Sequence, residues 1–211
     1  MKYLKLLRAE QWIKNIFVFI PLVFAADLFV VDKLVTTVLA ALVFCCFASA
    51  MYICNDIADR EQDALHPKKK TRPIAAGAIS VRVAIAVALG LVIMGVTLIR
   101  YWVPGVWFVM ALYVALNIAY TYFLKHVAIF DVLLVSFFYI LRILAVGLAT
   151  HTFISPWLIL CVIFLTLLLV LGKRYAEFAP ENKRQVLEFY TPQLLEHFIT
   201  IIVSLPIAPY G

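Results

Sequence analysis

The longest polar stretch of the chain covers residues 55–80, NDIADREQDALHPKKKTRPIAAGAIS, and apolar sequence lies on both sides of it. The apolar run before it covers residues 34–54, and the run after it covers residues 81–99. Each run is about 20 residues long, the length that an α-helix needs to cross the hydrocarbon core of a bilayer. The stretch therefore predicts a polar loop that joins two transmembrane helices.

The same pattern repeats along the chain. Transmembrane spans are expected at about 13–31, 34–54, 81–99, 103–123, 127–149 and 154–172, with a shorter apolar segment at about 194–208. With 65% hydrophobic and 14% charged residues and a mean hydropathy of +1.02, the composition excludes a water-soluble globular domain. Because lipid cannot satisfy exposed backbone groups, the spans should be helices. We predict an all-α, polytopic transmembrane helix bundle, six full spans plus a partial seventh, forming a single domain over residues 1–211.

The positive charges indicate the orientation of this bundle. If the N-terminus is cytoplasmic, 15 of the 18 Lys and Arg residues fall on that side, Lys33 and Arg100 fall on the other, and Arg142 lies within a span. Such asymmetry follows the positive-inside rule. The N-terminus and the aspartate-rich loop are therefore expected on the cytoplasmic face of the cell (inner) membrane. The net charge of +6 is then an orientation signal, and no nucleic-acid partner is expected.

The polar stretch also carries candidate metal ligands. Asn55, Asp59 and Asp63 follow one another at intervals of four residues, and Asp56 lies about 100° from Asn55 on a continuous helix. Three carboxylates on one such arc repel each other unless a cation lies between them. Mg²⁺ prefers one or two carboxylates together with water and phosphate oxygens. We therefore predict that all four residues bind Mg²⁺, with the three aspartates as catalytic residues.

Basic residues near this arc are candidate phosphate ligands. Lys68 to Lys70 and Arg72 follow the aspartates, although a solvated loop that only sets the orientation is an alternative for the lysines. Lys14 lies beside polar residues at the entrance to the first expected span, and Lys125 ends the fourth, where it binds phosphate or only sets the topology.

Two ionisable residues share the fifth expected span. Asp131 and Arg142 are eleven residues apart, which places them three turns apart on nearly the same face. Charged groups at membrane depth usually face the interior of the bundle or water. Asp131 is expected to help hold the polar head of a substrate. Arg142 is expected to bind a lipid phosphate or to pair with a neighbouring helix.

Several segments resemble the UbiA superfamily of intramembrane prenyltransferases. NDIADREQD followed by KTRPIAAGAIS resembles the first aspartate-rich motif of that superfamily, and residues 120–149, YTYFLKHVAIFDVLLVSFFYILRILAVGLA, resemble its middle section. Residues 8–22, RAEQWIKNIFVFIPL, and residues 155–179, SPWLILCVIFLTLLLVLGKRYAEFA, resemble the branch of decaprenyl-phosphate phosphoribosyltransferases. The resemblance implies a magnesium-dependent transferase that binds an activated diphosphate and opens to the membrane for a lipid.

The loop after the sixth expected span departs from the aromatic prenyltransferases of this superfamily. Those enzymes carry a second aspartate-rich motif there, whereas this chain has GKRYAEFAPENKR. The resemblance then implies 5-phosphoribosyl 1-diphosphate as the donor and a membrane polyprenyl phosphate as the acceptor. It also implies roles for individual residues. Phosphate would be bound by Lys14, Arg72, Lys125, Lys173 and Arg174, and the ribose oriented by Tyr175 and Glu177.

Two alternatives remain open from the sequence. One is a prenyltransferase that transfers a polyprenyl chain from its diphosphate to an aromatic acceptor such as 4-hydroxybenzoate. The other is an inactive membrane protein, because superfamily members continue through further spans where this chain ends in SLPIAPYG. The single domain is accordingly expected to be incomplete at its C-terminus. The sequence leaves the oligomeric state and the lipid chain length open.

Overall fold

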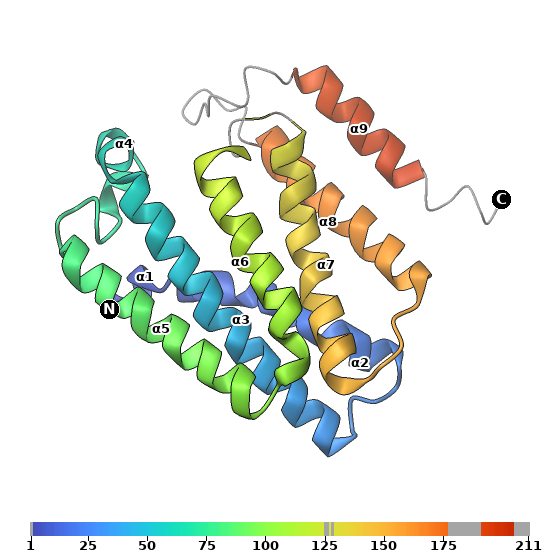
Figure 1. The fold of residues 1–211 in the computed structure, drawn as a ribbon. Coiled ribbons are helices and arrows are strands. Elements are labelled where there is room, and N and C mark those ends of the chain that lie inside the picture. The colour runs from blue at the N-terminus through green and yellow to red at the C-terminus, as the bar shows by residue number, and fades with distance from the viewer. Residues whose placement is uncertain (1, 125–126, 128, 177–190, 205–211) are drawn as a thin grey trace. The chain divides into compact units, whose positions relative to one another are not determined.

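The computed structural model describes residues 2–124, 127, 129–176 and 191–204, and the regular secondary structure in these ranges is entirely helical (Figure 1). Within them, five helical segments are long and apolar enough to cross a membrane. They are α3 (Val31–Ala58), α5 (Val81–Tyr101), α6 (Trp107–Tyr122) with the preceding 3₁₀ turn η3 (Pro104–Val106), α7 (Phe130–Thr150) and α8 (Pro156–Ala176). The predicted all-α membrane architecture and five of its expected spans are confirmed.

The segment expected to form the first span is built differently. Short α1 (Lys2–Leu6) is followed by a 3₁₀ helix, η1 (Ala9–Phe19), and by α2 (Ile20–Phe24), so residues 13–31 do not form one transmembrane α-helix. α2 ends at Phe24, and Ala26 just after it has a left-handed backbone, φ 58°, so the helical stretch stops before residue 31. Hydropathy alone does not distinguish η1 followed by α2 from one long α-helix.

The last apolar segment forms α9 (Pro192–Ser204), which is shorter than a full span. The prediction of a partial seventh helix agrees with it as far as Ser204, and positions 205–208 of that prediction lie outside the described residues.

The chain divides into two compact units. Unit 1 comprises Met1–Val114 and Ala145–Phe153, and unit 2 comprises Ala115–Leu144 and Ile154–Gly211. In unit 1, α3 and α5 lie side by side (Figure 1). An added Cβ at Gly95 of α5 would lie 2.6 Å from the ring of Phe47 on α3. A residue without a side chain therefore lets these two helices approach closely, as small residues do in membrane bundles.

The polar end of unit 1 rests on a small apolar cluster. It contains Leu6 of α1, Ile53 of α3, Ala84 of α5, and Ile74 and Ile79 of the segment that precedes α5. The same polar end carries α4 (Arg60–Leu65) and the short 3₁₀ turn η2 (Lys69–Thr71). The cluster thus anchors the N-terminal segment and the loop between α4 and α5 to the end of α3.

In unit 2, α8 packs against α9 (Figure 1). Val132 of α7, Val170 and Leu171 of α8, and Leu195 of α9 form its buried apolar cluster. The rings of Tyr120 on α6 and Phe138 on α7 meet edge to face, with their centroids 6.5 Å apart. This unit therefore joins four helices through contacts among residues that are far apart in the sequence.

Candidate active site

The aspartate-rich segment keeps helical hydrogen bonding across the end of α3. α3 ends at Ala58, Asp59 adopts φ −93° and ψ 8°, and α4 begins at Arg60. The backbone N–H groups of Asp59 and Asp63 still donate four residues back, to the carbonyls of Asn55 and Asp59 at 2.9 and 2.8 Å. Within this segment the four polar side chains form two pairs. Asn55 donates from Nδ2 to Oδ2 of Asp59 at 3.1 Å. Asp56 and Asp63 form the other pair, and both are 2% exposed.

Asp56 and Asp63 share one guanidinium group. Nη1 of Arg72 lies 3.1 Å from Oδ1 of Asp56 and 2.5 Å from Oδ2 of Asp63. Arg8 also forms an ion pair with Asp56, and the Lys69 ammonium lies 3.7 Å from Oδ1 of Asp63. Since a buried carboxylate is costly unless it is paired, this arrangement explains how two of them are accommodated. Two carboxylates here meet three cations. We call these five residues the acidic cluster: Arg8, Asp56, Asp63, Lys69 and Arg72.

Arg8 was not among the residues that the sequence indicated. It follows α1 with a left-handed backbone, φ 49°, which is uncommon for a residue other than glycine. Its guanidinium lies over the ring of Tyr52, 5.0 Å from the centroid, in addition to its ion pair with Asp56. Backbone strain of this kind is frequent at functional sites. In the sequence, Arg8 is one of several N-terminal cations that suit the positive-inside pattern, so nothing distinguished it.

The N-terminal segment is fastened to α3 by further polar contacts. Trp12 donates from Nε1 to Oγ of Ser49 at 3.0 Å, and Ser49 in turn donates to the carbonyl of Leu7 at 2.8 Å. The amide of Asn15 lies 3.1 Å from Sγ of Cys45, and Lys14 beside it is partly buried. These contacts hold Arg8 at the carboxylate end of α3.

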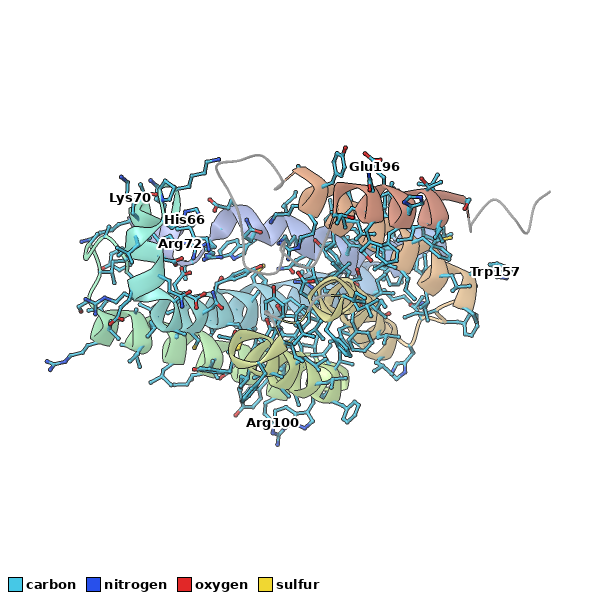
Figure 2. All side chains as sticks on the ribbon, turned by 90° about the horizontal axis from the view of Figure 1, so that it is seen from above. His66, Lys70, Arg72, Arg100, Trp157 and Glu196 are labelled. Carbon is cyan, nitrogen blue, oxygen red and sulfur yellow. The ribbon has the colours of Figure 1, made fainter. Side chains whose placement is uncertain are left out.

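The loop after α4 gathers basic side chains near the acidic cluster. Figure 2 shows His66, Lys70 and Arg72 beside α4, with Arg100 apart from them. Nδ1 of His66 accepts from the backbone N–H groups of Lys68 and Lys69, at 3.2 and 3.4 Å. Partial burial, followed by the nearby Lys69 ammonium, lowers the pKa of His66 from its ordinary value of 6.5. Neutral His66 thus helps to shape the loop that presents Lys69 and Arg72.

Unit 2 holds a separate buried ion pair. Asp131 of α7 is 1% exposed, and its Oδ2 lies 2.7 Å from Nη2 of Arg174 on α8. Both residues were expected to face a substrate, and the structure pairs them with each other. Arg142, also buried, donates to the carbonyl of Phe138 on its own helix at 2.6 Å and lies over the ring of Tyr139.

The remaining predicted residues lie near the end of α8 or outside the described ranges. Lys173 and Tyr175 are exposed, and the Tyr175 hydroxyl donates to Oε1 of Glu196 on α9 at 2.8 Å. The predictions for Lys125 and Glu177 fall on positions outside the residues that the structure describes. No sequence signal distinguished Glu196 as the partner of Tyr175.

The carboxylates of the acidic cluster suit a divalent cation whose remaining coordination positions are filled by a bound ligand. Within the described residues, no group of three His, Cys, Asp or Glu side chains is arranged to hold a metal. Two buried carboxylates do converge on one cationic group, which shows that positive charge is accommodated between them. Mg²⁺ commonly takes one or two carboxylates and draws its other ligands from water and substrate phosphates.

Five long apolar helices, with a buried acidic cluster at the end of one of them, define this chain as an integral membrane protein with a polar site at a helix end. The UbiA prenyltransferase family matches residues 16–176. The chain belongs to that family, a family of transferases.

Named relatives and solved structures agree with this assignment. The chain is 36% identical over 217 residues to a decaprenyl-phosphate phosphoribosyltransferase of Corynebacterium glutamicum, covering 99% of this chain and 65% of that protein. It is 37% identical over 224 residues to one of Mycobacterium tuberculosis, covering 98% of this chain and 72% of that protein. The fold is similar to that of a UbiA homolog from Archaeoglobus fulgidus bound to DMAPP and Mg²⁺. The TM-score is 0.80 at 17% identity, over 99% of this chain and 76% of that one.

Proposed function

We propose that this protein transfers 5-phosphoribose from 5-phosphoribosyl 1-diphosphate to a membrane polyprenyl phosphate in a Mg²⁺-dependent reaction. The observation that carries the proposal is the 36–37% identity, over almost the whole chain, to proteins named decaprenyl-phosphate phosphoribosyltransferase. The chain spans about two thirds of the length of those proteins, 65% and 72%.

The reaction needs charge neutralisation more than it needs a base. An oxygen of the polyprenyl phosphate attacks the anomeric carbon of the ribose, and the bond from that carbon to the diphosphate breaks. The acceptor is already an anion at neutral pH, so no proton has to be removed from it. The site has to orient the two reactants and stabilise the negative charge that develops on the departing diphosphate.

The acidic cluster supplies groups for this task. Asp56 and Asp63, with the neighbouring Asn55–Asp59 pair, would hold Mg²⁺, which neutralises the diphosphate as a Lewis acid when it is bound. Arg8 contacts Asp56, and Arg72 contacts both Asp56 and Asp63. With a cation held by the carboxylates, both guanidinium groups would be available to donate to phosphate oxygens. Their planar donor geometry suits phosphate well.

Other residues keep the roles that the family resemblance implies. Lys14, Lys125 and Lys173 are proposed to contact phosphate, and Tyr175 and Glu177 to orient the ribose. Asp131 and Arg174 pair with each other, so we propose that they join α7 to α8 and do not contact the substrate themselves. Arg142 is proposed to bind the phosphate group of the lipid acceptor. The site is proposed to face the cytoplasm, because most of the basic residues gather on its side of the membrane.

A transfer assay tests the proposal. Membranes that contain the protein are incubated with labelled 5-phosphoribosyl 1-diphosphate, polyprenyl phosphate and Mg²⁺. We expect a labelled lipid that does not form when polyprenyl phosphate or Mg²⁺ is omitted. Absence of this lipid, together with prenylation of 4-hydroxybenzoate from a polyprenyl diphosphate, would replace the proposal with aromatic prenyl transfer.

A further inference from the structure

A cavity of about 490 Å³ opens between α4 and the start of α5. Two arginines, Arg60 and Arg82, line it together with Ile74, Ile79, Ser80 and Val81. We call it the α4–α5 pocket. The cations that pair with Asp56 and Asp63 are other residues, so this pocket is distinct from the acidic cluster.

The two arginines of the α4–α5 pocket differ from Arg8 and Arg72, which form ion pairs with a carboxylate. Arg60 and Arg82 are both exposed, and no carboxylate within the described part of the chain forms an ion pair with either. Two guanidinium groups on the rim of one cavity create a positive potential there. An anion with several acceptor oxygens, such as a phosphate diester, is the complementary ligand.

The rest of the pocket is apolar and continues along an exposed helix face. Ile74 and Ile79 are buried, at 2% and 5% exposure, and belong to the apolar cluster below the pocket. Below Arg82 on α5, the apolar side chains Ile85, Leu89 and Ile93 are 46%, 58% and 66% exposed. At 100° per residue these positions lie within about 80° of one another and of Arg82. An apolar stripe about 16 Å long therefore leads from the pocket along a membrane-spanning helix.

We propose that the α4–α5 pocket binds an anionic glycerophospholipid of the surrounding bilayer. Arg60 and Arg82 would hold its phosphate group, and an acyl chain would lie along Ile85, Leu89 and Ile93. A free phosphate would use only the rim of this arrangement and leave the stripe uncovered. A zwitterionic lipid would bring a cationic group toward two arginines. Net negative charge and an acyl chain are therefore both required, and basic pockets at membrane helix ends suit such lipids.

Lipid retention by the purified protein tests this proposal independently of the transfer reaction. The protein is incubated in detergent with phosphatidylglycerol or phosphatidylcholine of the same acyl chains, and bound lipid is counted by native mass spectrometry. The test variant is R60Q/R82Q. The matched control is R100Q, which removes an exposed arginine from the opposite end of α5 (Figure 2). We expect the parent and R100Q to retain phosphatidylglycerol and R60Q/R82Q to bind it at least about 10-fold more weakly.

Other outcomes would overturn the proposal. These are equal retention of phosphatidylglycerol by R60Q/R82Q, equal binding of phosphatidylcholine, displacement by millimolar inorganic phosphate, or preferential binding of polyprenyl phosphate. If R60Q/R82Q is not monodisperse, the single variants R82Q and R82K replace it. R82K is then expected to retain the lipid because it keeps the charge, and R82Q to lose it, whereas equal retention by both would contradict the assignment.

Discussion

The two units each bury aspartates beside arginine, but in different arrangements. In unit 2, Asp131 of α7 pairs with Arg174 of α8, and both side chains are buried. In unit 1, Asp56 and Asp63 meet Arg8, Arg72 and Lys69, so that one cluster brings several cations onto two carboxylates. We propose that the pair in unit 2 mainly joins its helices. We propose that the cluster in unit 1 could exchange partners with a metal and a phosphate, as a diphosphate site requires.

The largest effect is expected from the carboxylates of the acidic cluster. D63N should leave no measurable phosphoribosyl transfer, because it removes a charge that holds both the proposed metal and Arg72. The measurement is the labelled-lipid assay in membranes with matched protein levels. D32N, which changes an exposed aspartate at the other end of α3, should retain full activity. Activity of D63N near that of D32N would remove the acidic cluster from the reaction.

The Asp131–Arg174 pair should instead affect stability most strongly. R174Q removes a cation from a buried carboxylate, a change that typically costs about 3–5 kcal/mol. The measurement is the unfolding midpoint in detergent. The double variant D131L/R174M removes both charges together and should recover most of the loss, because apolar replacement of a buried pair is often neutral. A double variant as unstable as R174Q would show that the pair does more than join α7 to α8.

Arg8 should have an intermediate effect on binding. R8Q is expected to weaken binding of the magnesium complex of 5-phosphoribosyl 1-diphosphate by about 10- to 100-fold, the range for a hydrogen bond to a charged group. Isothermal titration of the purified protein measures it. K5Q, an exposed cation of the same N-terminal segment, is the control and should bind like the parent. Equal affinities for R8Q and K5Q would leave Arg8 as a structural contact only.

The smallest effect is a pH dependence at His66. Because the pKa of His66 is lowered in the folded protein, the unfolded chain binds its proton more readily. The stabilising contribution of neutral His66 is therefore present above about pH 6.5 and is lost as pH falls below this value. We expect the unfolding midpoint of H66Q to fall less between pH 7.5 and pH 5 than that of the parent. Parallel curves for the two proteins would contradict the role of His66 in shaping the loop.

The sequence predicted the membrane helices well because the bilayer constrains them directly. α3, α5, α7 and α8 fall where long apolar runs predict them, since lipid requires both their length and their composition. The prediction of the first span was wrong because hydropathy does not register the 3₁₀ conformation of η1 or the left-handed backbone at Ala26 that follows α2.

The sequence indicated several residues of the acidic cluster, but not how they pair. The aspartates of the NDIADREQD stretch were identified from their spacing, whereas the change of backbone at Asp59 is a local conformation that spacing does not encode. Arg8 lies 48 residues before Asp56, and contacts at such separation depend on the packing of the N-terminal segment. Asp131 and Arg174 were both indicated, yet only the structure shows that they pair with each other.

Binding of a manganese–pyrophosphate complex tests most directly whether the acidic cluster and the Asp131–Arg174 pair differ in function. Mn²⁺ replaces Mg²⁺ as a paramagnetic probe, and electron paramagnetic resonance of the purified protein measures the bound ion with and without pyrophosphate. We expect the parent and D131L/R174M to bind the complex and D56N/D63N not to bind it. Equal binding by D56N/D63N and the parent would contradict this expectation, because the acidic cluster would then not be the diphosphate site.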